Sequence, residues 1–204
     1  MKKLESIMGM PITIEVKGKG REVKEAIEKV FANSPKGQFA IFRTSWVYGD
    51  GGNFIRTMLR LAKDREELKV IHDQHGVPTS AEWLARVSLD LALDTQGVLK
   101  QFPSGIYHAV PAGETTWHGL ATFAVQAALN AGIELKAKPA AIKPILAVEY
   151  PLPAPRPMNS RMDHSKLRMA LKNQGSMSKL DSIDEPWSIA VQGYIQALAK
   201  DRFI

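Results

Sequence analysis

Apolar and polar positions follow first a strand-like and then a helix-like period in the opening part of the chain. Residues 11–16 place apolar side chains at every second position, as a half-buried strand does. Residues 21–31 carry apolar side chains at intervals of three and four, which traces one stripe along a helix. Residues 38–42 are a short apolar run, typical of a buried strand. The pattern predicts a β-α-β unit over residues 11–42, with two parallel strands and a right-handed crossover.

The same alternation of helices and strands continues through the rest of the chain. We expect helices over residues 54–63, 79–91, 116–131 and 186–198, and strands over residues 69–72 and 105–110. Thr79 and Glu82 have the spacing of a capping box, in which the Thr79 hydroxyl accepts the Glu82 amide. Either Thr115 or Thr116 caps the third helix. Four prolines between residues 151 and 157 exclude helix and sheet ladder, so that segment is expected to be extended.

Composition narrows the class of protein. The chain has 204 residues, of which 45% are hydrophobic and 24% charged, so it is long enough for one medium domain or two small ones. Lys and Arg outnumber Asp and Glu by 27 to 21, and this net charge of +6 favours polyanions or one anionic ligand. Cysteine is absent, which excludes disulfides, thiolate metal sites and a cysteine nucleophile. No apolar run approaches the roughly 20 residues of a membrane span, and the start lacks a signal-peptide core, so we expect a cytoplasmic protein.

Several local patterns suggest binding chemistry, and each has a simpler explanation beside it. Gly18-Lys19-Gly20 could approach a phosphate, but Val23 stands where a third glycine would be needed, which favours an ordinary tight turn. His72 and His75 could bind a metal, but in a strand-to-loop segment they do not face one another, so we expect no metal site. The basic residues of the 54–65 segment either face solvent or face an anion; these are Arg56, Arg60, Lys63 and Arg65.

Trp46 is the aromatic residue that we expect at a ligand. It stands where a buried strand ends and a glycine-rich loop begins, and ligands of α/β sheets bind at the carboxyl ends of strands.

Residues 42–49, Phe-Arg-Thr-Ser-Trp-Val-Tyr-Gly, resemble a segment of the dTDP-4-dehydrorhamnose reductases, the NAD(P)H-dependent enzymes that complete dTDP-L-rhamnose synthesis. Further similar segments follow in the family's order at residues 52–54, 57–63, 73–79, 105–108, 115–118, 150–154 and 156–160. The resemblance covers about residues 38–170 and, more loosely, the final helix. It implies an α/β fold: a partial Rossmann-like parallel sheet, to which the residue 1–42 unit adds strands, and a C-terminal α/β substrate-binding subdomain over residues 43–204.

The resemblance also implies a set of substrate-binding residues. Thr44, Ser45 and Trp46 lie at the end of a strand, with Trp46 beside the deoxysugar. The pocket wall is formed by Asn53, Gln74, Pro78 and Thr79. Arg156 and Asn159 hold the sugar nucleotide. The chemistry agrees, because an arginine fork suits a diphosphate and an indole face suits an apolar sugar face. One departure is Gly52, which stands where the family usually has the first asparagine of a pair.

A larger departure concerns catalysis. The family is similar to short-chain dehydrogenases, in which a Tyr-x-x-x-Lys dyad protonates the nascent alkoxide and holds the cofactor ribose. Here the four tyrosines are followed, four residues later, by Gly52, Pro111, Ala154 and Leu198, and none of these is lysine. Residues 1–42 hold one β-α-β unit, whereas a dinucleotide fold needs two β-α-β-α-β halves. The resemblance therefore implies NADPH or NADH as the family's cofactor, while we assign no catalytic or cofactor-binding residue in this chain.

By resemblance we expect a dTDP-4-dehydrorhamnose reductase that is truncated and weak or inactive alone. One alternative is a non-catalytic sugar-nucleotide-binding module. Another is a joined chain with a foreign N-terminal segment, since residues 8–16 are not typical of the family and faintly resemble the start of proteins that transfer FMN. In each case the expected partner is a dTDP-sugar nucleotide rather than nucleic acid or membrane, and a homodimer is compatible with the sequence.

Overall fold

The computed structural model describes residues 6–7, 10–11, 37–151, 154, 156–173 and 183–201. The chain divides into two compact units, residues 1–39 and 40–204. In the first unit, β1 (Ser6–Ile7) pairs antiparallel with β2 (Met10–Pro11). The predicted helix over residues 21–31, the Gly18–Gly20 turn and all but the first residue of the predicted strand over 11–16 lie outside the described residues.

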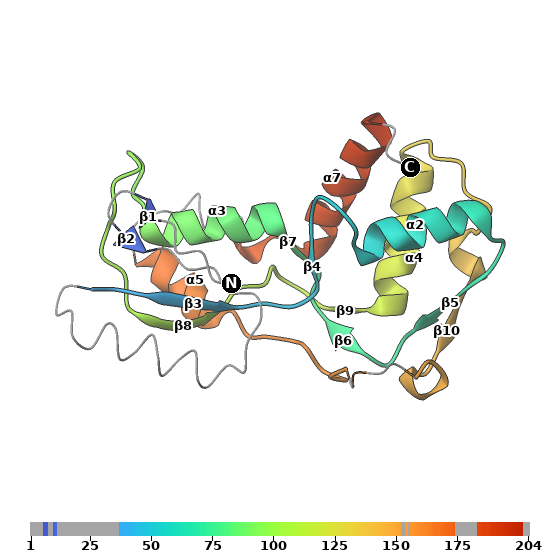
Figure 1. Cartoon of the computed structure of the whole chain (residues 1–204), viewed down its shortest axis with the longest axis horizontal. Helices are drawn as coiled ribbons and strands as arrows, with labels where there is room; N and C mark the ends of the chain where they lie inside the picture. The colour runs from blue at the N-terminus through green and yellow to red at the C-terminus, as the bar shows by residue number, and fades with distance from the viewer. Residues whose placement is uncertain are drawn as a thin grey trace. The chain divides into compact units, whose positions relative to one another are not determined.

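The second unit alternates strands and helices (Figure 1). Its strands are β3 (Ala40–Arg43), β4 (Val47–Tyr48), β5 (Leu68–Ile71), β6 (His75–Gly76), β7 (Thr79–Ser80), β8 (Gly105–His108), β9 (Thr115–Thr116) and β10 (Ile142–Ile145). Its helices are α2 (Phe54–Asp64), α3 (Ala81–Ala92), α4 (Trp117–Asn130), α5 (Ser165–Lys172) and α7 (Trp187–Lys200), with 3-10 turns η1 (Pro139–Ala141) and η2 (Ala147–Glu149). These bounds confirm the predicted elements after residue 38, whereas β10, α5 and the two-residue strands β4, β6, β7 and β9 were not predicted.

Three of the four strand pairs among the described residues of this unit are parallel. β3 pairs with β8, β5 with β10, and β4 with β7, while β6 and β9 run antiparallel. Parallel pairs need helical crossovers, and the chain supplies α2 and α3 between β3 and β8 and α3 and α4 between β5 and β10. The α/β prediction is thereby confirmed.

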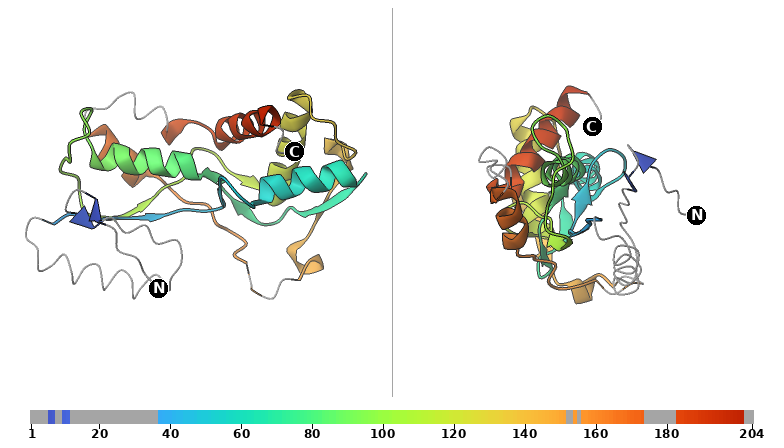
Figure 2. Two further views of the ribbon diagram at one scale, coloured as in Figure 1. Left: turned by 45° about the horizontal axis from the view of Figure 1, so that its top comes forward. Right: turned by 90° about the vertical axis from the view of Figure 1, so that its left-hand side faces the viewer.

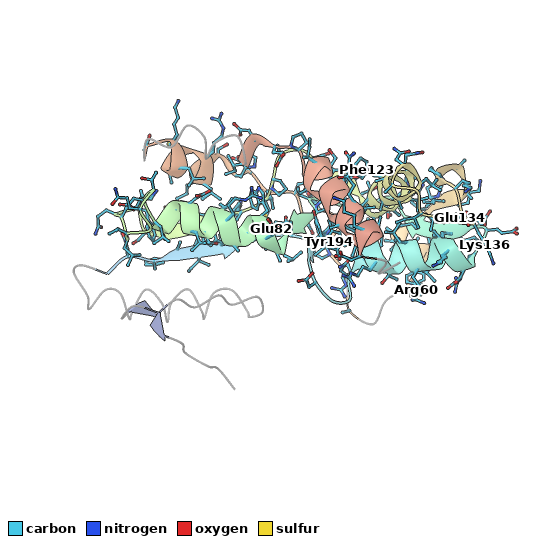
Figure 3. All side chains as sticks on the ribbon, turned by 90° about the horizontal axis from the view of Figure 1, so that it is seen from above. Arg60, Glu82, Phe123, Glu134, Lys136 and Tyr194 are labelled. Carbon is cyan, nitrogen blue, oxygen red and sulfur yellow. The ribbon has the colours of Figure 1, made fainter. Side chains whose placement is uncertain are left out.

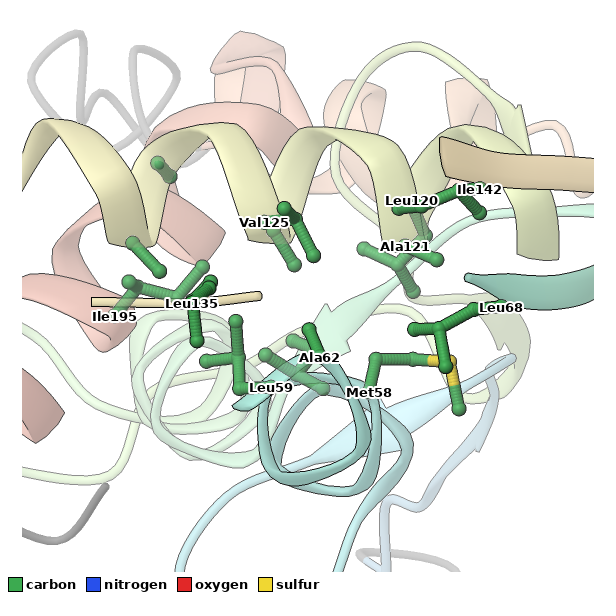
Figure 4. Packing of buried hydrophobic residues seen from close by; sticks show 14 of the residues in the cluster. Met58, Leu59, Ala62, Leu68, Leu120, Ala121, Val125, Leu135, Ile142 and Ile195 are labelled. Carbon is green, nitrogen blue, oxygen red and sulfur yellow. The ribbon is translucent and has the colours of Figure 1, made fainter. Parts of the chain in front are cut away.

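Two hydrophobic clusters hold the unit together. The larger one is formed where α4 packs against α2, α7 and the β5–β10 pair, with Leu59, Ala121 and Ile195 fully buried (Figure 4). The smaller cluster joins α3, β8 and α5 through Trp83, Tyr107 and Leu167. Figures 1 and 2 show the helices α3 and α5 along the β3–β8 pair. Each cluster buries the apolar stripe that periodicity assigns to its helices.

The helix N-termini differ from the predictions at one point. Thr116 caps α4, accepting the Gly119 amide at 3.0 Å, as one of the two predicted alternatives. The predicted capping box at Thr79 is wrong, because Ser80 caps α3 and accepts the Trp83 amide at 3.3 Å. Thr79 is fully buried in β7, where pairing with β4 keeps it extended, so the helix begins one residue later than expected. No helix among the described residues is long and apolar enough to cross a bilayer.

Candidate ligand-binding site

A cavity of about 930 Å³ lies in the second unit, beside α2 and β5 and under the segment of residues 156–162. Its apolar wall comes mainly from α2, β5 and α4, and includes Phe54, Met58, Leu61, Val70 and Trp117. Four cationic side chains also line it, namely Arg65, Lys69, Arg156 and Arg161. No Asp or Glu of the described residues is part of the lining. The volume is in the range of pockets that hold small organic ligands, and the charge favours an anion.

Two hydroxyl-bearing residues at the end of β3 belong to the cavity lining. Thr44 and Ser45 follow β3 directly, and both line the cavity. The Ser45 hydroxyl donates to the Val77 carbonyl at 2.9 Å, so it is already engaged within the fold. The Thr44 hydroxyl is buried and has no hydrogen-bond partner among the described residues. A buried unpaired hydroxyl is uncommon, and this one belongs to a residue of the cavity lining.

Trp46 lies in an aromatic stack at the cavity wall. Its indole lies 3.8 Å from that of Trp117, centroid to centroid, and Phe54 packs on Trp117 at 4.6 Å. A Cβ built on Gly76 would lie 2.5 Å from Cε2, 2.7 Å from Cζ2 and 2.9 Å from Nε1 of Trp46. Such similar distances to three adjacent ring atoms place Gly76 over an indole face, and Trp117 occupies the opposite one. Trp46 therefore presents an edge to the cavity, whereas the sequence suggested an open face.

The segment after the prolines forms the polar side of the site. It is held to β6 by the Ser160 amide, which donates to the His75 carbonyl at 2.7 Å, and by the His75 amide, which donates to Met158. The Asn159 side-chain oxygen accepts from the backbone and the Nε of Arg161, both at 3.0 Å. Arg161 also pairs with Glu114 at 3.2 Å. Asn159 thus orients Arg161, a cationic lining residue that sequence reasoning missed.

Six of the nine residues predicted for substrate binding line the cavity, and three do not. The six are Thr44, Ser45, Trp46, Gln74, Arg156 and Asn159. Asn53, Pro78 and Thr79 lie outside the lining. Asn53 instead caps α2, accepting the Arg56 amide at 3.1 Å, while Thr79 is fully buried and donates its hydroxyl to Val77.

Of the four basic residues on the 54–65 segment, only Arg65 lines the cavity. Arg60 and Lys63 are exposed, and Arg56 donates to the Tyr194 hydroxyl. The α2 helix turns its apolar stripe toward the cavity and the core, and this stripe is the signal by which Phe54, Met58 and Leu61 could have been found. His72 and His75 belong to no cluster of three or more potential metal ligands in the part of the chain that is described.

Tyr48 is the most strongly perturbed titratable group near the site. Burial raises the pKa of its phenol far above the ordinary value, and the neighbouring Tyr194 and Glu82 add to this effect. Its hydroxyl, like that of Thr44, has no hydrogen-bond partner among the described residues.

Comparison with known proteins relates this site to one family. Residues 16–183 match the family model described as RmlD substrate binding domain. A dTDP-4-dehydrorhamnose reductase of Escherichia coli is 46% identical over 151 residues, which is 72% of this chain and 48% of that protein. The enzyme of the same name from Shigella flexneri is 49% identical over 131 residues, 63% of this chain and 42% of that protein. The chain spans about half the length of the curated relatives it matches.

Solved structures agree with the sequence matches. A dTDP-4-dehydrorhamnose reductase of Clostridium acetobutylicum superposes with a TM-score of 0.63 at 32% identity, covering 88% of this chain and 55% of that one. The Bacillus anthracis enzyme, solved in complex with NADP, gives a TM-score of 0.58 at 27% identity, covering 83% of this chain and 52% of that one. The family match also includes residues 16–37, where the sequence showed no family motif, and it ends before α7.

Proposed function

The chain belongs to the RmlD substrate binding domain family, and we propose that it binds a dTDP-sugar nucleotide in the cavity as the substrate-binding part of a dTDP-4-dehydrorhamnose reductase. The observation that carries this proposal is the combination of four cationic side chains with an aromatic and aliphatic wall in one cavity. A nucleotide sugar of this class has complementary parts: a doubly charged diphosphate, a flat base and a deoxysugar with an apolar methyl group.

Individual residues support the same ligand chemistry. Arg156 can give several N–H donors to phosphate oxygens, and charge-assisted bonds of this kind are the stronger ones. Arg161 already donates through Nε to Asn159 and through Nη1 to Glu114, which leaves its Nη2 group for a phosphate. The Gln74 side-chain amide, in the cavity lining, can hydrogen-bond the sugar's oxygens. Phe54 and Trp117 give an apolar surface to the base or the sugar methyl.

Reduction of a 4-keto sugar needs a hydride, which NADPH supplies when bound to enzymes of this type. The described residues do not fit such a cofactor. The glycine-rich loop before α2 has its tip at Gly51 and Gly52, whose missing Cβ atoms face open space rather than a cradle. Asn53 covers the start of α2 by capping it. No tyrosine of the chain is followed by lysine four residues later. We therefore propose ligand binding by this chain without turnover, and we derive no hydride step from its residues.

Calorimetric titration of the full chain tests the binding proposal. We expect dTDP-L-rhamnose to bind more tightly than dTDP, and dTDP more tightly than dTMP, because each step removes a part that the cavity recognises. GDP-mannose is the control ligand, with a diphosphate but a different base and sugar. Equal affinity for GDP-mannose and dTDP-L-rhamnose, or no binding of either, would contradict the proposal.

A second assay separates a binding module from an active reductase. The chain is mixed with NADPH and dTDP-4-dehydro-L-rhamnose, and absorbance of the nicotinamide is followed. We expect no oxidation above background, since general acid catalysis alone is worth roughly 10²–10⁴-fold and its Tyr-x-x-x-Lys group is missing. Steady oxidation would show that the chain is an enzyme by itself.

A further inference from the structure

The hydroxyl of Tyr194, on α7, connects three groups that are far from it in sequence. It donates to the Gly49 carbonyl at 2.9 Å and accepts from Asn53 Nδ2 at 2.8 Å and from Arg56 Nε at 2.8 Å. A phenol has one donor and two acceptor positions, so its hydrogen-bonding capacity is fully used. Figure 3 shows Tyr194 on the ribbon of α7, above the region where α2 begins.

These contacts close the loop between β4 and α2. Gly49 is its first residue, Asn53 its last, and Arg56 lies in the first turn of α2. The tip of the loop, at Gly51 and Gly52, is loosely packed, because a Cβ on either glycine would touch nothing within 4 Å. Gly51 also has a φ of +87°, in the region that favours glycine. Ordering such a glycine-rich loop is entropically costly, so the contacts at its ends decide where α2 starts.

The start of α2 in turn positions the cavity wall. Phe54, the first residue of the helix, lines the cavity and packs on Trp117, and Met58 and Leu61 line it one and two turns later. Tyr194 is itself held by neighbours that do not depend on its hydroxyl. Val191 and Ile195 on the same helix are fully buried, and the Tyr194 ring packs on that of Tyr48 at 5.2 Å.

We propose that Tyr194 is a positioning residue for the ligand site: its hydroxyl fixes the loop of residues 49–53 and, through α2, the apolar wall against which the ligand packs. The helix that carries it lies beyond the residues matched by the family model. The inference rests on the proposed function, since the affected property is affinity for the sugar nucleotide.

The test compares two Tyr→Phe variants of the full chain. Tyr194→Phe removes the hydroxyl and keeps the ring. Tyr107→Phe is the matched control, because Tyr107 lies in the smaller hydrophobic cluster, outside the cavity lining, and its hydroxyl bonds the Pro103 carbonyl. Affinity for dTDP-L-rhamnose is measured by calorimetry, and amide exchange is measured by mass spectrometry without ligand. We expect Tyr194→Phe to bind about tenfold more weakly, with faster exchange in residues 49–57, and Tyr107→Phe to bind like the parent.

Each outcome decides between the proposals. Parent-like affinity of Tyr194→Phe, or equal losses in both variants, overturns the positioning role while leaving the proposed function intact. Absence of binding by the parent chain overturns both. Should Tyr194→Phe fail to fold, Asn53→Asp serves instead, because it keeps an oxygen to cap α2 and removes the amide donor to Tyr194 and Gly49. A tenfold loss in that variant supports the role, and parent-like binding overturns it.

Discussion

The indole of Trp46 lies nearly parallel to that of Trp117, with 3.8 Å between the ring centroids and 17° between the ring planes. Trp46 reaches this position from a backbone φ of +46°, the only positive value among non-glycine residues in the described part of the chain. Such a conformation costs on the order of 1–3 kcal/mol and persists where surrounding contacts hold it. Here the contacts are the stack itself and the Thr79 amide, which donates to the Trp46 carbonyl at 3.3 Å.

Gly76→Ala is expected to disrupt this stack. The new methyl group would meet the Trp46 ring at 2.5–2.9 Å, so either the indole or β6 must move. Overpacking of this kind costs about 1–3 kcal/mol. The variant should therefore unfold at lower urea concentration, and the circular dichroism couplet that two stacked indoles produce should weaken.

Gly193→Ala is the control for that substitution. Gly193 lies within α7, and a Cβ there would meet nothing within 4 Å. Alanine in a helix is favoured over glycine by about 0.5–1 kcal/mol, so this variant should be slightly more stable with an unchanged couplet. A couplet that survives Gly76→Ala would mean that Trp46 is not held between Gly76 and Trp117.

Removing the Thr44 hydroxyl and removing the Ser45 hydroxyl, both at the end of β3, should have different effects on stability and ligand affinity. Thr44→Val replaces a buried hydroxyl that has no partner within the fold by a methyl group of similar size. Stability should stay level or rise, since an unsatisfied buried hydroxyl is destabilising. If a ligand oxygen uses that hydroxyl, affinity for dTDP-L-rhamnose should fall about tenfold in calorimetry.

Ser45→Ala is the complementary variant. The Ser45 hydroxyl donates to the Val77 carbonyl and accepts the Val77 amide at 3.3 Å, so its loss should lower the free energy of unfolding by about 1 kcal/mol. Affinity should change little at concentrations where the variant is folded. The reverse pattern, with binding lost in Ser45→Ala and kept in Thr44→Val, would assign the ligand contact to the other hydroxyl.

Periodicity could predict most of the second unit because its helices bury continuous apolar stripes. It could not predict β10, since Ile142–Ile145 contains Lys143 and Pro144 and lacks the alternation of a half-buried strand. β10 forms because it pairs with β5, a contact that is distant in sequence. The capping box at Thr79 failed for the same reason, because the pairing of β7 with β4 outweighs a local preference.

The lining of the cavity could be predicted only in part, because family motifs mark positions without stating what each side chain does. Asn53 belongs to such a motif, yet in the structure its two side-chain atoms cap α2 and bind Tyr194, 141 residues away. Arg161 could not be singled out from sequence, since its place in the lining depends on Asn159 and Glu114. The residues beyond Pro11 in the predicted strand, and those of the predicted helix over 21–31, stay predictions.

Arg156 is expected to provide affinity through its charge. It is exposed at the cavity, so its bond to a phosphate is charge-assisted but partly screened. Arg156→Ala should weaken binding of dTDP-L-rhamnose about tenfold at low salt and by less at about 1 M salt, where screening is strong. Arg86→Ala, an exposed arginine on α3 outside the lining, is the matched control. Equal losses of affinity in Arg156→Ala and Arg86→Ala would mean that the net charge of the chain, and not a contact of Arg156, determines binding.

Tyr48 should lower the stability of the folded chain at alkaline pH. Its phenol is 5% exposed, and burial raises its pKa above the ordinary value of 10.0. The folded state therefore holds this proton more tightly than the unfolded state. Its contribution to stability is fully present below pH 10 and is lost as the pH rises from there toward the folded-state pKa. The free energy of unfolding should fall by up to about 1.4 kcal/mol per pH unit from this group alone.

Tyr48→Phe isolates that contribution from the lysines and the other tyrosines, which titrate in both proteins. At pH 8 the variant should be as stable as the parent or slightly more so, because the lost hydroxyl has no partner and the ring can still pack on Tyr194. Between pH 10 and 11 the parent should lose stability faster than the variant in urea unfolding monitored by circular dichroism. Parallel pH profiles would show that the Tyr48 phenol ionises without unfolding, which would place it in contact with solvent and contradict its burial in the larger hydrophobic cluster.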